Sequence, residues 1–328
     1  MAGTGLETQL TPPFQMQIFW VVGAVELLRL NEIEDLYAPV NGSQIHYQRA
    51  GNGRPLLLIH GLVGSARNWR LNIQELAKDA TVYAIDLLNM GESDRISGLD
   101  ASLEATADTL ARWMDAVGLA QADVAAHSHG GAIAMMLAAR HPERVGKLVL
   151  FAPANPFCDL GHQLIAFYQT RPGRFLASLI PVLPQFVKAT ALGRMYGDPS
   201  RATRDSLEGY TAGLARPGSV DHVLQIVQRW HSDMGALGAE LSRLVAHPVL
   251  LVWGDRDRAV GLSSARQLQE LMPQSELLVL PGVGHIAFEE MPEVCNRAMR
   301  DWLAGSQLPS VAYSMGYQNE PLRQLEAV

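Results

Sequence analysis

The sequence predicts a doubly wound α/β protein, with a mostly parallel sheet, helices on both faces and an inserted helical cap. Short runs that are apolar throughout alternate with amphipathic segments, which is typical of parallel strands covered on both faces. One long interval, between Pro153 and Pro248, contains no strand-like run. Its apolar stretches suit helices broken by Pro and Gly, so this interval predicts the cap.

The expected elements follow the chain in order. The alternating stretch SQIHYQRAG (43–51) predicts an antiparallel edge strand. Buried parallel strands are predicted at 56–60, 81–87, 122–128, 147–153, 248–254 and 275–282. Helices are predicted at 100–118, 130–140, 262–271 and 292–303. In the first helix the apolar residues from Leu103 to Val117 share one face, and Gly118 is the expected C-cap.

This pattern divides the chain into four parts. They are an N-terminal helical extension (1–36), an α/β core (37–154 and 237–305), a helical cap (155–236) and a polar C-terminal tail (306–328). The cap is expected over the carboxyl ends of the strands, where open α/β sheets bind their ligands.

Composition narrows the function classes. Hydrophobic residues make up 48% of the chain, which suits a packed core. The net charge of −7 and the lack of a Lys/Arg cluster argue against a nucleic-acid partner. Cys158 and Cys295 are too few for a disulfide scaffold and lack metal-ligand spacing. We therefore expect a reducing, cytoplasmic location, no metal, no cofactor, and a monomer or homodimer.

The N-terminal stretch IFWVVGAV (18–25) is apolar, but Glu26 and Arg29 interrupt it before it reaches the length of a membrane span. No basic n-region of a signal peptide precedes it. We expect a short helix that packs on the body of the protein. The alternative is an interfacial helix, in which residues 18–30 make weak contact with a membrane surface, or a cover over the active-site mouth.

Ser128, in AAHSHGG (125–131), lies where a strand-like run ends and a helix-like run begins. A reactive serine at such a junction needs a sharp turn, which brings strand and helix so close that the residues two before and two after must be small. Ala126 and Gly130 meet this requirement, and Gly131 extends the clearance. Ser128 is therefore the candidate nucleophile.

A serine nucleophile needs a base. His127 and His129 flank Ser128, but adjacent side chains on a tight turn point away from each other, so neither is favoured. His285, in PGVGHIAFEEMP, follows the last strand-like run, and Gly282 and Gly284 let its loop turn sharply. We predict that His285 is the base.

The third group of a triad is a carboxylate that holds the imidazole in the correct tautomer. VWGDRDRAV places Asp255 and Asp257 directly after the strand at 248–254. Either carboxylate fits this role on position alone.

With these residues placed, the chain resembles the α/β-hydrolase superfamily, in its branch of capped serine esterases, lipases and C–C hydrolases, over residues 40–305. HGLVGSARNW is similar to the family's His-Gly loop, and DLLNMGESD to its D-x-P-G-x-G-x-S-D loop. HSHGG, GDRD and GVGH resemble its nucleophile, acid and base motifs. The resemblance implies Asp257 as the acid, with Asp255 as second choice.

The resemblance also implies an oxyanion hole made by the backbone N–H groups of Leu62 and His129, while His60 braces its loop. Two departures stand out. Residues 88–90 read Leu-Asn-Met where Pro-Gly-His is common, and we expect the loop to survive because Asn tolerates a left-handed conformation. The nucleophile is followed by His instead of the frequent Met or Gln, so this ring is expected to influence substrate range.

These assignments imply a carboxylic ester hydrolase that works through an acyl-enzyme intermediate on a small apolar ester. A serine nucleophile disfavours relatives that use Asp, such as epoxide hydrolases and haloalkane dehalogenases. C–C bond hydrolases of the meta-cleavage type and lactonases use the same triad and remain open. From a different class, a non-catalytic receptor with the hydrolase shape is the alternative.

Overall fold

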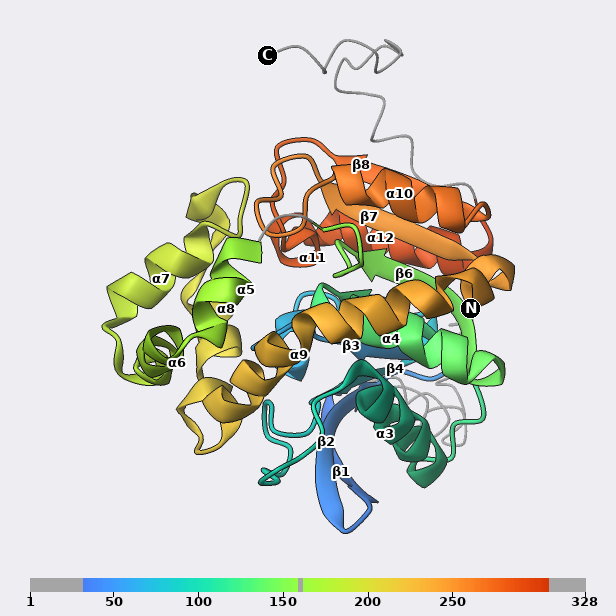
Figure 1. Ribbon diagram of the computed structural model, residues 1–328. Helices are drawn as coiled ribbons and strands as arrows, with labels where there is room; N and C mark the ends of the chain where they lie inside the picture. The colour runs from blue at the N-terminus through green and yellow to red at the C-terminus, as the bar shows by residue number, and fades with distance from the viewer. Residues whose placement is uncertain (1–31, 159–161, 307–328) are drawn as a thin grey trace, which may run out of the picture.

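The computed structural model describes residues 32–158 and 162–306 (Figure 1). Its eight-stranded sheet has the order β1-β2-β4-β3-β5-β6-β7-β8. Strands from β3 to β8 are parallel, whereas β1 and β2 are antiparallel to their neighbours. The predicted doubly wound, mostly parallel fold is confirmed. The strands are β1 (Glu34–Val40), β2 (Ser43–Ala50), β3 (Arg54–Ile59), β4 (Ala80–Ile85), β5 (Ala122–His127), β6 (Val145–Phe151), β7 (Val249–Gly254) and β8 (Ser275–Leu280).

Two expectations at the N-terminal side need correction. The stretch 43–51 does form an antiparallel strand, but β2 lies inside the sheet because β1 pairs with its outer edge. β1 was not predicted, since its alternation in EDLYAPV is weak. The predicted boundary between residues 36 and 37 therefore falls inside a strand. Residues 18–30 lie outside the described residues, and the tail at 306–328 does so except for Ser306.

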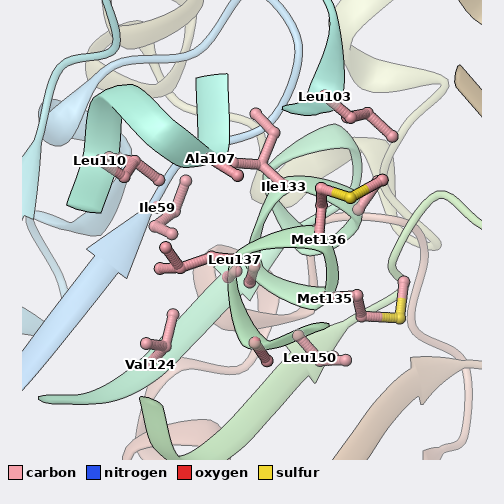
Figure 2. Packing of buried hydrophobic residues seen from close by; sticks show 14 of the residues in the cluster. Ile59, Leu103, Ala107, Leu110, Val124, Ile133, Met135, Met136, Leu137 and Leu150 are labelled. Atoms are coloured by element: carbon pink, nitrogen blue, oxygen red, sulfur yellow. The ribbon is translucent and has the colours of Figure 1, made fainter. Parts of the chain in front are cut away.

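Alternate residues of each strand point to opposite faces of the sheet, and each face has its own apolar core. Figure 2 shows Ile59, Val124 and Leu150 from the sheet packing against helices that carry Leu110 and Ile133. The predicted core helices are confirmed within a few residues. The core helices are η1 (Ala66–Trp69), α2 (Ile73–Leu76), α3 (Leu103–Ala116), α4 (His129–Arg140), η2 (Pro142–Arg144), α10 (Ser263–Leu271), α11 (Ala287–Glu290) and α12 (Pro292–Ala304).

The described residues between β6 and β7 form helices and connecting loops without a strand, and the helical cap predicted at 155–236 lies in this interval. The proposed boundary between residues 236 and 237 falls inside α9, so one continuous helix belongs to both parts. These helices are α5 (His162–Gln169), α6 (Arg171–Ser178), η3 (Ile180–Val182), α7 (Gln185–Gly193), η4 (Pro199–Arg201), α8 (Arg204–Thr211), η5 (Gly213–Ala215), α9 (Ser219–Glu240) and η6 (Leu241–Ala246).

The cap segment is held on loops that follow the carboxyl ends of the strands. The backbone N–H of His285, after β8, donates to Met195 at 2.7 Å. Ser65, after β3, donates to the carbonyl of Gly209. Arg95, after β4, bonds Ser219. The cap segment therefore covers the edge of the sheet where the candidate residues lie.

Candidate active site

The predicted nucleophile, acid and base all lie at the carboxyl edge of the sheet. Ser128 directly follows β5, Asp257 follows β7 and His285 follows β8. β5, β6, β7 and β8 are consecutive neighbours in the sheet. Loops at one edge of a parallel sheet meet there, which is why residues so distant in the chain share one region.

Ser128 occupies a strained turn between β5 and α4. Its φ of 52° and ψ of −121° are rare for a residue with a side chain, and such strain costs about 1–3 kcal/mol. The turn is held by a hydrogen bond from its N–H to the carbonyl of Phe151 at 3.0 Å and by three that its carbonyl accepts from the N–H groups of Gly131, Ala132 and Ala154. The strain sets the serine at the junction of strand and helix, as a nucleophile requires.

Glycines make this turn sterically feasible. A Cβ on Gly130 would lie 2.2 Å from the carbonyl oxygen of His60, and one on Gly131 would lie 2.5 Å from Pro153. A Cβ on Gly61 would lie 3.2 Å from that of Ser128. The small residues expected around the nucleophile are thus required by close packing, and the His-Gly loop runs directly beside the serine.

Asp257 and His285 form a hydrogen-bonded pair. The Nδ1 atom of His285 lies 2.8 Å from Oδ2 of Asp257, whose side chain is fully buried. The other oxygen of Asp257 accepts from the N–H groups of Ala259 and Val260. The carboxylate is therefore fixed, and it leaves Nε2 as the imidazole nitrogen free to exchange a proton.

Asp255, the second choice for the acid, does a different job. Its Oδ1 accepts a hydrogen bond from the N–H of Gly282 at 2.7 Å, and the residue is exposed. Asp255 therefore braces the loop that carries His285, and of these two carboxylates it is Asp257 that bonds the imidazole.

His127 and His60 act through the backbone. The Nε2 atom of His127 lies 3.1 Å from the carbonyl oxygen of His285. Burial, and then the nearby His285, lowers the pKa of His127 well below its usual range. His60 bonds the carbonyl of Gly61 through Nδ1 and accepts from the N–H of Leu87 through Nε2. Burial lowers the pKa of His60 as well, so both rings are neutral braces.

The two N–H groups assigned to the oxyanion hole are available. His129 is the first residue of α4, whose initial N–H groups have no partner within the helix. Within residues 32–158 and 162–306, no hydrogen bond engages the backbone N–H of Leu62 or of His129. Leu62 belongs to the loop beside Ser128. Both N–H groups can therefore receive a negatively charged oxygen.

The loop after β4 keeps its shape despite its departure from the family pattern. Asn89 adopts a φ of 64°, the left-handed conformation expected of it. Asp86 accepts hydrogen bonds from the N–H groups of Ala66 and Glu92 at 2.6 and 2.7 Å. It also bonds Nδ1 of His46. This carboxylate ties the loops after β3 and β4 together and so supports Leu62.

A narrow apolar pocket adjoins the two N–H groups, with a volume of about 30 Å³. Leu62 and His129 line it, together with apolar residues of the core and of α9. Burial, and then His222 and His60, lowers the pKa of His129 to about 3, so its ring is neutral, and it stacks on Trp230 of α9. His129, which departs from the family pattern at the position after Ser128, therefore forms one wall of the pocket.

Sequence reasoning missed His222, on the cap helix α9. The residue is 6% exposed and lines the pocket, and its Nδ1 is buried without a hydrogen-bond partner among the described residues. Burial, with a smaller effect of Arg95, lowers its pKa to about 4. A neutral imidazole with an unused nitrogen can bind a polar group of a ligand. The sequence signal that could have found His222 is its place in the apolar, helix-compatible stretch VDHVLQIVQRW.

The fold and its carboxyl edge define a class: a doubly wound α/β protein in which a strained serine, an Asp–His pair and two open N–H groups share one edge of the sheet. A family model for the alpha/beta hydrolase fold matches residues 54–292. The chain belongs to the alpha/beta hydrolase family.

Similar proteins include an acetyltransferase component and several hydrolases. A dihydrolipoyllysine-residue acetyltransferase component of the acetoin cleaving system, from Pseudomonas putida, is 31% identical over 81% of this chain and 68% of its own. The 2-hydroxymuconate semialdehyde hydrolase of Pseudomonas sp. (strain CF600) is 29% identical over 74% of this chain and 84% of its own. The structure of a meta-cleavage product hydrolase from Pseudomonas fluorescens IP01 is 25% identical with a TM-score of 0.71, covering 82% of this chain and 97% of that one.

Proposed function

We propose that this protein is a serine hydrolase that cleaves a neutral carboxylic ester with a short apolar acyl group. Ser128, His285 and Asp257 are the proposed triad. The observation that carries the proposal is the buried Asp257–His285 pair at the same sheet edge as a strained serine. Membership of a hydrolase family supports hydrolytic chemistry in general.

In the proposed mechanism, Oγ of Ser128 attacks the ester carbonyl carbon while Nε2 of His285 takes its proton. The N–H groups of Leu62 and His129 stabilise the oxyanion; one such donor is worth about 10²–10³ in rate. The protonated imidazole, held by Asp257, then gives its proton to the departing alcohol. Water, deprotonated by His285, attacks the acyl-enzyme and releases the acid and the free serine.

The charge and the volume of the pocket favour a substrate whose acyl group is small and neutral. Its described lining contains no Lys or Arg and includes one carboxylate, Asp100. Hydrogen bonding from Ser102 lowers the pKa of the exposed Asp100, so this carboxylate is ionised and does not attract an anionic substrate. A volume of about 30 Å³ is well below the ~300–1,000 Å³ of typical ligand sites. A longer acyl group would require α9 to move.

A C–C bond hydrolase is the second candidate. Relatives named as hydrolases of 2-hydroxymuconate semialdehyde and 2-hydroxy-6-oxo-2,4-heptadienoate favour it. Such substrates carry a carboxylate, which the lining of the narrow apolar pocket does not favour. Lactone hydrolysis is an ester reaction and falls within the first candidate. We also propose a cytoplasmic location. The chain has two cysteines, which is compatible with a reducing compartment.

The test is a comparison of kcat/KM for p-nitrophenyl esters of graded acyl length and for one meta-cleavage dienoate. We expect the acetyl ester to be the best substrate, with kcat/KM falling as the acyl chain lengthens. A clear preference for the dienoate would select the second candidate instead. Labelling of Ser128 by a fluorophosphonate without turnover of any substrate would indicate a receptor.

Ser128→Ala is the matched control, because it removes one oxygen at an otherwise unchanged turn. We expect it to abolish both turnover and labelling while the thermal unfolding curve is retained. Full activity in a folded Ser128→Ala variant would refute the proposed nucleophile.

A further inference from the structure

The outer side of the cap segment carries a group of exposed apolar side chains, which we call the apolar cap face: Phe175, Leu176, Leu179, Val182 and Phe186. Their exposed fractions run from 37% for Leu179 to 77% for Val182. They belong to α6, its C-cap, η3 and the start of α7, and Figure 1 shows α6 and α7 on the side of the cap away from the sheet. A cluster of exposed large apolar residues within residues 175–186 favours an interaction surface.

Packing within α6 directs these large side chains outward. The buried residues of α6 are Gly173 and Ala177. A Cβ on Gly173 would lie 2.1 Å from the carbonyl oxygen of Phe167, so α5 and α6 meet backbone to backbone. An ordinary surface helix buries its large apolar residues. Here the small residues face the cap interior and the large apolar ones face solvent.

The same segment is basic. Residues 160–197 contain Arg171, Arg174, Lys188 and Arg194 and no Asp or Glu, in a chain of net charge −7. None of the four cations forms an ion pair with the residues that the structure describes. No single described helix is long and apolar enough to span a membrane; Arg171–Val182 with Gln185–Gly193 meet the requirement together, but with a bend of 111°.

We propose that the apolar cap face docks on an anionic lipid surface. Apolar side chains enter the boundary between headgroups and acyl chains, and the flanking cations contact the anionic headgroups. A second copy of the chain fits less well, because a two-fold contact would bring the cations of both copies together. This proposal does not involve residues 18–30, and it does not depend on the proposed esterase activity.

One cation of the basic segment, Arg174, also lines a groove on the cap. Arg174 of α6 and His222 of α9 line one groove on the cap. His222 lines the narrow apolar pocket too. The groove and the narrow apolar pocket therefore share His222.

The experiment is flotation of the full chain with vesicles of phosphatidylcholine alone or with added phosphatidylglycerol, at low and high salt. We expect binding only to the anionic vesicles, weakened by salt. Phe175→Ser combined with Phe186→Ser should abolish it. The control is Tyr37→Ser combined with Leu271→Ser, which removes two apolar side chains exposed elsewhere, by 55% and 41%, and should bind normally.

A charge variant separates the electrostatic contribution. Arg171→Gln combined with Arg194→Gln should lower partitioning roughly fivefold per charge. Circular dichroism and thermal unfolding check that each variant is folded. The proposal is overturned if the wild-type chain does not float with anionic vesicles. It is overturned too if Phe175→Ser combined with Phe186→Ser floats equally well, because binding would then lie elsewhere. A different result in sedimentation would also overturn it. In that result the wild-type chain is a dimer that does not bind vesicles, and only Phe175→Ser combined with Phe186→Ser disrupts the dimer.

Discussion

The Nε2 atom of His127 lies 3.1 Å from the carbonyl oxygen of His285, and the two rings pack with centroids 4.6 Å apart. The residue before the proposed nucleophile thus supports the backbone of the proposed base. Because the hydrogen bond of His127 goes to the main chain of His285 and the contact between the two side chains is ring packing, we infer that His127 positions the base and does not exchange protons with substrate.

His127→Leu tests this role. Loss of the hydrogen bond should displace His285 and reduce kcat by up to about 10²-fold, without moving the pH at which activity is half-maximal. His285→Ala, which removes the proposed base, should cost about 10⁴-fold or more. Steady-state kinetics across pH measures both, and equal losses in the two variants would contradict the assignment.

The two carboxylates after β7 allow a matched comparison. Asp257→Asn keeps the shape but loses the charge beside His285, so kcat should fall by about 10⁴-fold. Asp255→Asn weakens only the hydrogen bond to Gly282 and should leave kcat within a few fold. Circular dichroism checks the folding of both. A larger loss in the Asp255 variant would reverse the choice of acid.

Gly130 and Gly235 offer opposite outcomes for the same substitution in a helix. Gly130→Ala places a Cβ 2.2 Å from the carbonyl oxygen of His60, and such overpacking costs about 1–3 kcal/mol. Gly235→Ala on α9 has nothing within 4 Å and should stabilise by about 0.5–1 kcal/mol. Urea unfolding measures both free energies. Equal effects would mean that strand and helix are not closely packed at the serine.

His222 should make the protein sensitive to acid. Burial lowers its pKa to about 4 in the folded protein, whereas the unfolded chain takes up the proton near pH 6.5. Its contribution to stability is therefore complete above about pH 6.5 and is lost as the pH falls through about 4.

His222→Gln removes this titration but keeps a polar side chain. Between about pH 7.5 and about pH 5 its unfolding free energy should fall less steeply than that of the wild type. Denaturant unfolding at both pH values measures the difference. Parallel pH dependence would show that the folded protein accepts the proton as readily as the unfolded chain.

The local pattern at Ser128 was readable from the sequence because each requirement there concerns a neighbour in the chain. Small residues at fixed offsets indicate a sharp turn, and the strained φ of 52° with the close approach of Gly130 agrees. The left-handed conformation of Asn89 follows from the same kind of local rule.

Long-range choices were not readable in this way. Asp255 and Asp257 differ by two positions, and spacing alone left both candidates open, with only family resemblance favouring one. The structure separates them, since a turn closed by the bond from Asp257 to Gly254 and two N–H donors aim one carboxylate at His285, while Asp255 bonds Gly282. β1 was missed because it is secured by pairing with β2 instead of by its own burial.

By itself, the sequence determined the α/β class, the order of the parallel strands along the chain and the glycine-lined serine turn. These depend on periodicity, residue size and backbone freedom, which act over a few residues. Only the tertiary structure decided which carboxylate meets His285, that His127 and His60 are buried braces, and that His222 reaches the pocket from α9. It also decided which cap side chains stay exposed, because burial and partner choice depend on contacts between distant segments.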